Sequence, residues 1–207
     1  NKLVKNSIQE NALHYDKAGE QHYDIISAFI KSIRGSDPNA ALYYLARMVI
    51  GGEDPKFIAR RLLILASEDI GNANPNALLM ANNCFQAVNV IGYPECELIL
   101  SQAVVYLASS PKSNSSYQAI KKAKKLVLET GNLSVPLSIR NAPTQLMKDL
   151  DYGKKYKYAH DYPENFVDQE FMPEEIIGEK LWEPADNPRE EEMRKRMKNF
   201  WGKKYDY

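Results

Sequence analysis

Apolar residues recur at the spacing of an α-helix through the first 131 residues of the chain. Ile26, Phe29, Ile30 and Ile33 follow the i, i+3, i+4, i+7 pattern of one helix face, and later segments repeat it. No stretch alternates apolar and polar residues for long enough to predict a strand. The pattern therefore predicts an all-α protein.

Prolines and glycines divide this region into helices of similar length. Asp37-Pro38, Asp54-Pro55 and Asn74-Pro75 each place a capping side chain before a proline that suits the first helical turn. Glycines follow where each helix should end, because glycine enters the left-handed cap conformation easily. We predict six helices, at about 22–34, 38–50, 55–70, 75–91, 94–109 and 115–130. Their close spacing favours antiparallel neighbours in a compact bundle.

The composition of the chain and its apolar pattern change after Gly131. Residues 151–187 are rich in tyrosine, proline, glycine and charge, which is typical of a functional segment or one that wraps an interface. A short helix at about 143–150 and a terminal helix at 188–201 flank this irregular stretch. We therefore expect a boundary segment at 1–21, a helical domain at 22–131, and an extension at 132–207 that packs on the bundle or on a neighbouring subunit.

The charge, the apolar runs and the cysteines of the chain exclude several classes of protein. The 27 basic and 27 acidic residues cancel, so no overall field draws the chain to nucleic acid or a membrane. No apolar run approaches the roughly 18–20 residues that cross a bilayer. Cys84 and Cys96 lack CxxC spacing and are typical of reduced cytoplasmic thiols. The chain begins at Asn1, which predicts a fragment of a longer protein.

Motifs for nucleotide binding or hydrolysis are absent from the sequence. It contains no Gx4GK[ST], GxGxxG, HExxH or GxSxG. His14 and His22 share a helical spacing, but no carboxylates complete a metal site, and no role follows for His160. We therefore predict no catalytic, cofactor-binding or metal-binding residue, and a stand-alone enzyme is disfavoured.

The helix predicted at 55–70 carries apolar residues around much of its surface. Such a helix is either central to the bundle or covered on a second side by another subunit. Glu68 and Asp69 point about 100° apart on a helix, so a shared proton or metal is disfavoured. Arg61 and Glu68 lie on one face and suit an ion pair or an interface contact. The interface residues that we predict are Phe57, Arg61, Ile64 and Glu68.

A second surface combines basic and aromatic residues between positions 140 and 158, which we call the Lys/Tyr segment. Phosphate neutralisation and base stacking on its rings would suit single-stranded nucleic acid. A tyrosine-rich loop packed on its own domain, with lysines left in water, is the alternative. The nucleic-acid-binding residues that we predict are Arg140, Lys148, Lys154, Lys155, Tyr156 and Lys157.

Opposite charges follow one another at the end of the chain. Residues 161–192 hold twelve acidic and two basic side chains, and residues 193–207 hold six basic and one acidic. This pattern favours docking of the tail within the protein or against another subunit over a simple polyanion surface.

Several longer motifs follow one another along the chain. They are HYDIISAF at 22–29, KSIRGSDP at 31–38, GEDPKFIARR at 52–61, SEDIGNA at 67–73, YLA at 106–108, PKSN at 111–114, RNAPT at 140–144, YG at 152–153, YAHD at 158–161 and EP at 183–184. In this order the motifs resemble the C-terminal half of the RarA/MgsA family, the replication-associated recombination AAA+ ATPases. The Werner-helicase-interacting ATPase is the eukaryotic relative of that family. Ile30, Tyr44 and Asn74 depart from the histidine, tryptophan and aspartate that are usual in it.

The resemblance implies a helical collar like that of clamp-loader subunits, through which family members form homotetramers. The ATP- and Mg-binding machinery of the family lies N-terminal to the matched region and is absent from this chain. The parent protein would be a DNA-dependent ATPase of the bacterial cytoplasm and nucleoid. It would act at stalled forks on single-stranded DNA or duplex ends, alongside single-strand-binding protein.

Two hypotheses follow for the function of the chain. The first is an oligomerisation module that joins protomers, with tetramers as the expected assembly. The alternative is a module that binds single-stranded DNA or a replication partner through the Lys/Tyr segment.

Overall fold

The computed structural model describes residues 20–207 and consists of helices, turns and loops, with no strand in that range. This confirms the all-α prediction. The predicted boundary segment at 1–21 and His14 fall almost wholly outside the described residues. The described chain forms two compact units. The helical unit runs to Tyr117 and includes Ala185–Arg189, and the C-terminal unit comprises Gln118–Pro184 and Glu190–Tyr207.

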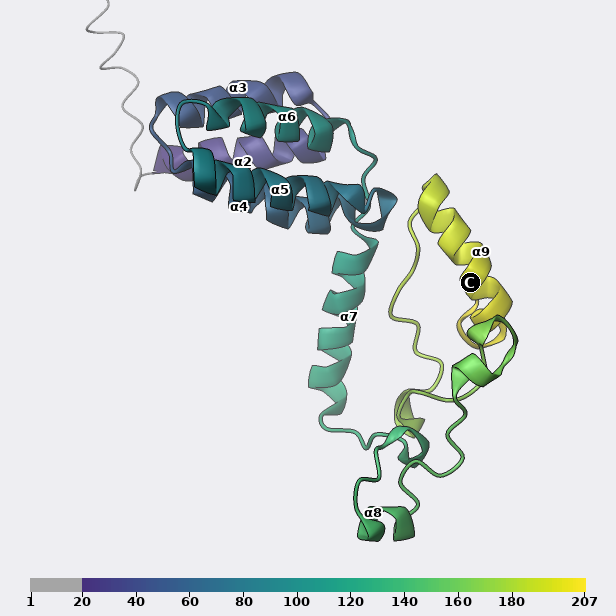
Figure 1. Ribbon diagram of the computed structural model, residues 1–207. Helices are drawn as coiled ribbons and strands as arrows, with labels where there is room; N and C mark the ends of the chain where they lie inside the picture. The colour runs from purple at the N-terminus through teal and green to yellow at the C-terminus, as the bar shows by residue number, and fades with distance from the viewer. Residues whose placement is uncertain (1–19) are drawn as a thin grey trace, which may run out of the picture. The chain divides into compact units, whose positions relative to one another are not determined.

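The helical unit is a bundle whose helices follow the predicted ranges closely. In the bundle, α3 packs against both α2 and α6, and α5 packs against both α4 and α6 (Figure 1). The next helix, α7, begins in this unit and continues into the C-terminal unit, so the two units divide earlier than at Gly131. The helices are α2 (Glu20–Arg34), α3 (Pro38–Ile50), α4 (Pro55–Leu65), α5 (Asn76–Ile91), α6 (Cys96–Ser109) and α7 (Ser115–Thr130).

Two of the three predicted proline caps form. Asp37 and Asp54 accept backbone N–H bonds in the first turns of α3 and α4, at 2.9 and 3.0 Å. Asn74 was predicted to cap the next helix and does not. Its amide donates to the hydroxyls of Tyr106 and Ser110 at 3.0 and 3.1 Å, which ties the start of α5 to α6.

The core of the bundle explains the wide apolar surface of α4. Ile58 and Leu62 are fully buried, together with Phe29 of α2 and Leu100 of α6. The bundle itself therefore covers most of α4. This agrees with the first of the two interpretations of its sequence, in which the helix is central to the bundle. Ile64 is its main exposed apolar side chain, at 49%.

The last turn of the predicted helix at 55–70 is a π-helix, Ala66–Ile70. The wider turn ends at Gly71, whose φ of 48° lies in the left-handed region. The Ser113 N–H donates to the carbonyl of Asp69 at 2.8 Å, so the segment after α6 is tied to this turn. A π-turn of this kind often marks a functional position in a helix.

The C-terminal unit is irregular over most of its length, as predicted. It holds the rest of α7, short α8 (Gln145–Asp149), several single 3₁₀ turns, and most of α9 (Pro188–Tyr205). Phe166 stacks on Phe200 of α9 with ring centroids 4.4 Å apart, and Trp201 meets the same ring edge-on at 5.1 Å. These aromatic contacts fix α9 against the loop that precedes it. Within residues 20–207, no helix is long and apolar enough to cross a membrane.

Candidate assembly and nucleic-acid surfaces

The structure separates the four predicted interface residues of α4 into different environments. Phe57 and Arg61 line a groove of about 500 Å³ between α2 and α4, which we call the α2–α4 groove. Ile64 is exposed on the next turn. Glu68 lies 3.8 Å from Arg34 of α2, and residues 22–207 show no ion pair between Glu68 and Arg61. Of the two uses predicted for Arg61 and Glu68, the ion pair between them does not form, and Glu68 pairs with Arg34 of another helix instead; the interface contact stays a prediction.

Arg34 connects α2 with the π-turn through a short ion pair. Its Nε lies 2.6 Å from Oδ1 of Asp69, whose side chain is only 9% exposed. The hydrogen bond to Asp69 raises the pKa of Arg34, although partial burial acts in the opposite direction. The second carboxylate oxygen of Asp69 is buried with no hydrogen-bond partner among the described residues. Arg34 therefore forms an ion pair with a nearly buried negative charge.

The outer face of α5 is unusually free of charge. Over residues 70–111 the charged side chains are Glu95 and Glu97, and both lie outside α5. Leu79 and Val90 are 63% and 83% exposed near the two ends of the helix. Depletion of charge on an exposed surface is typical of the core of a protein interface. The residues that form this surface, called the α5 face below, are Leu79, Asn82, Asn83, Gln86 and Val90.

The α5 face was not among the predicted surfaces, although its signal is visible in the sequence. A run of some forty residues with two charges is uncommon in a chain that is 26% charged overall. Exposure could not be assigned without the fold, because an uncharged helix of this kind could equally be buried on all sides.

Two predicted residues of the Lys/Tyr segment, Arg140 and Lys154, form contacts within the C-terminal unit. Arg140 donates from Nε to the carbonyl of Val135 at 2.6 Å and from Nη1 to the hydroxyl of Tyr152 at 3.2 Å. Its guanidinium also lies over the Tyr152 ring, 5.1 Å from the centroid. Lys154 forms an ion pair with Asp151 at 2.9 Å. These contacts give Arg140 a structural role inside the C-terminal unit.

The other predicted nucleic-acid-binding residues are more accessible. Lys148, Lys155 and Lys157 are exposed, and none forms an ion pair within residues 22–207. Tyr156 is 49% exposed and lines a pocket of about 450 Å³ together with Phe171. Of the predicted set, Arg140 and Tyr156 line this one pocket, and the exposed lysines lie outside its lining.

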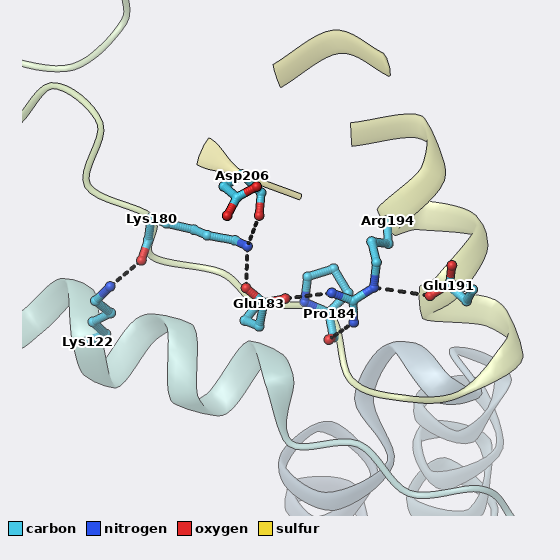
Figure 2. Close-up of polar contacts among 7 residues, drawn as sticks. All are labelled: Lys122, Lys180, Glu183, Pro184, Glu191, Arg194 and Asp206. Atoms are coloured by element: carbon cyan, nitrogen blue, oxygen red, sulfur yellow. Dashed lines mark hydrogen bonds and ion pairs between the residues drawn. The ribbon is translucent and has the colours of Figure 1, made fainter. Parts of the chain in front are cut away.

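The acidic and basic stretches at the end of the chain meet inside the C-terminal unit. Arg194 of α9 binds Glu183 at 2.6 Å and Glu191 at 3.1 Å, and Lys180 also pairs with Glu183 (Figure 2). Lys122 of α7 donates to the Lys180 carbonyl, so α7 joins the same network. The hydrogen bond from Lys180 lowers the pKa of Glu183, partial burial opposes this effect, and the hydrogen bond from Arg194 lowers the pKa further. The tail is therefore held by its own complementary charges.

The two described histidines occupy different settings. His22 contacts Glu53, with Nδ1 and Oε2 3.0 Å apart, and lies beside the Phe57 ring. His160 is exposed and within 3.2 Å of the Asn165 amide oxygen. No group of three or more metal-ligating side chains occurs in the part of the chain that the structure describes.

Two family comparisons place the chain among AAA+ proteins. Residues 1–34 match the family described as AAA C-terminal domain, and residues 35–201 match the family described as MgsA AAA+ ATPase C terminal. The all-helical bundle and the matched sequence together define the C-terminal region of an AAA+ ATPase. Because the match covers most of its length, the chain belongs to the MgsA family.

Curated relatives agree with this assignment. Replication-associated recombination protein A of Coxiella burnetii is 46% identical over 96% of this chain and 45% of its own length. The protein of the same name from Escherichia coli K12 is 44% identical, over 85% of this chain and 40% of its own. ATPase WRNIP1 of Dictyostelium discoideum is 42% identical, over 88% of this chain and 21% of its own. The chain spans less than half the length of these relatives.

Proposed function

We propose that the helical unit is an oligomerisation module that joins copies of a parent AAA+ ATPase through the α5 face. The parent would bind ATP and Mg in a core outside these 207 residues and would act on DNA in replication-associated recombination. The observation that carries the proposal is the exposure of Leu79 and Val90 on a helix with no charged residue. Exposed apolar side chains on a surface without charge are typical of the core of a protein interface.

The number of copies follows from the family resemblance and is part of the proposal. A ring of identical subunits with closed symmetry would place the ATPase cores around DNA, and tetramers are the expected form. Phe57, Arg61, Ile64 and Glu68 stay predictions as interface residues, and of these Ile64 is the best placed for a contact.

Leu79→Lys tests the α5 face, because it places a charge where water would be excluded from the core of an interface. Burying a leucine contributes about 1.5–3 kcal/mol, so the substitution should weaken each contact at least about tenfold. Sedimentation velocity of the 207-residue chain would measure the change. Val127→Lys is the matched control, because Val127 is 61% exposed and lies on α7 among lysines. Equal effects of the two substitutions, or no effect of Leu79→Lys on an assembled chain, would contradict the proposal.

A second function is favoured by the exposed lysines beside Tyr156. We propose that the Lys/Tyr segment binds single-stranded DNA, with Lys148, Lys155 and Lys157 near phosphates and the Tyr156 ring stacked on a base. Binding of an oligothymidylate should weaken steeply with salt. Replacing Lys155 and Lys157 by glutamate should flatten that dependence by about one unit of slope per lysine. Lys124→Glu on α7 is the control. If it changes the salt dependence of binding as much, the assignment of the Lys/Tyr segment to DNA binding would be wrong.

A further inference from the structure

The α2–α4 groove combines an apolar floor with a positively charged edge. Ile26 and Ile30 of α2 and Phe57 of α4 form the floor, and the groove encloses about 500 Å³. Ile26 and Ile30 are almost fully buried, whereas Tyr23 stands at the edge and is 71% exposed. A groove of this size accommodates one or two apolar side chains of a peptide.

The charged side chains that line the groove are all basic. Lys31, Arg34 and Arg61 line it, and none of its described lining residues is acidic. Asp69 and Glu68 compensate Arg34 from outside the groove. Lys31 and Arg61, in contrast, form no ion pair within residues 22–207.

Arg61 is the strongest indication that the groove is incomplete as it stands. Its Nε is buried and has no hydrogen-bond acceptor among the described residues. A buried donor without an acceptor is unfavourable, and a guanidinium is suited to bind a carboxylate through two parallel bonds. Arg61 lines the groove, so a carboxylate that enters the groove would meet its guanidinium.

We propose that the α2–α4 groove is a docking site for an acidic peptide segment of a partner protein. The segment would place glutamate or aspartate side chains on Arg61 and Lys31, and an aliphatic or aromatic side chain on the floor beside Phe57. Charge complementarity selects the sign of the peptide, and the apolar floor selects a segment in which carboxylates flank large apolar residues.

Other occupants fit the groove less well. Residues 1–19 of the chain carry three lysines against Glu10 and Asp16, so their net charge has the same sign as the groove. Nucleic acid needs a track of cations for successive phosphates, whereas this groove offers two uncompensated cations on an isoleucine and phenylalanine floor. The groove shares no residue with the α5 face, but Phe57 and Arg61 are also predicted interface residues, so the test below includes a measurement of assembly.

Fluorescence anisotropy of the 207-residue chain with a labelled peptide, Glu-Glu-Leu-Phe-Glu-Glu-Ile-Glu, tests the proposal. We expect saturable binding that falls about tenfold with Arg61→Glu and severalfold with Lys31→Glu. Arg60→Glu is the matched control, because Arg60 neighbours Arg61 on α4, pairs with Asp54 and lies outside the groove lining. Circular dichroism would establish that each variant is folded.

Control peptides and a control polymer decide between the possible results. Glutamine in place of glutamate, or alanine in place of the apolar residues, should abolish binding. Binding that survives Arg61→Glu, or that is equal for the glutamine peptide, would overturn the proposal, as would no binding at all. An oligothymidylate bound with the same Arg61 dependence would assign the groove to nucleic acid instead. A change in sedimentation mass with Arg61→Glu would assign it to a second copy of the chain, whereas the Leu79→Lys result leaves the peptide test unaffected.

Discussion

The ion pair between Arg34 and Asp69 allows a quantitative test of how α2 is fastened to the π-turn. In Arg34→Met, the Asp69 carboxylate, whose side chain is 9% exposed, loses its partner. Removing one partner of a fully buried pair costs about 3–5 kcal/mol. The Arg34 side chain is 45% exposed, so water and salt already weaken the interaction, and we discount the loss to about 2 kcal/mol.

Urea and thermal unfolding followed by circular dichroism would measure this loss. Arg34 and Asp69 both lie in the helical unit, which has roughly 100 described residues. For a domain of that size, a destabilisation of about 2 kcal/mol corresponds to a fall in Tm of about 10 °C. Arg47→Met is the control, since Arg47 is exposed on α3 and makes no ion pair among the described residues, and it should stay within about 0.5 kcal/mol of the unmodified chain.

A double variant separates the ion pair from other effects of removing Arg34. Adding Asp69→Asn to Arg34→Met removes the orphaned charge, so the two losses of stability should not add. Strict additivity, or a loss for Arg34→Met no larger than that for Arg47→Met, would refute the assignment of a nearly buried, coupled pair.

Three further predictions test other parts of the structure. Burial raises the pKa of Cys84 to about 11, and Cys96 is also buried. Neither thiol should therefore react with iodoacetamide at mildly alkaline pH until urea unfolds the chain. Rapid labelling of the folded chain would contradict this burial. Gly71→Ala should destabilise by about 1–2 kcal/mol in urea unfolding, because φ is +48° and the new Cβ would lie 3.1 Å from a backbone carbonyl oxygen; a neutral result would argue against the π-turn geometry. Ion pairs lower the pKa of Glu183 below its ordinary value of 4.5. The stability that these ion pairs give is therefore present above pH 4.5, and it is lost as the pH falls through the lowered pKa of Glu183. Both tryptophans lie in the C-terminal unit, so their fluorescence should report this acid transition, and an unchanged signal in acid would count against it.

The helices could be predicted because their signals are local. Asp37 and Asp54 cap α3 and α4 with side chains that lie next to the helices they begin. Apolar spacing such as that of Ile26, Phe29 and Ile33 records which face of a helix is buried, so the ranges of the helices are visible without the fold.

The parts that the sequence did not predict depend on contacts between distant residues. Asn74 has the pattern of a cap, but its amide bonds to α6, thirty-two and thirty-six positions away. Glu68 was expected to face Arg61 on its own helix, and the π-turn and Arg34 of α2 change its partner. The exposure of Leu79 on the α5 face likewise depends on which side of α5 the neighbouring helices cover.

Sedimentation equilibrium of the unmodified 207-residue chain over a wide concentration range tests the central proposal most directly. Assembly through the helical unit predicts a mass near four times the 23.6 kDa of one chain, with dissociation only on strong dilution. A mass of 23.6 kDa at every concentration would contradict the proposal that this chain is the oligomerisation module.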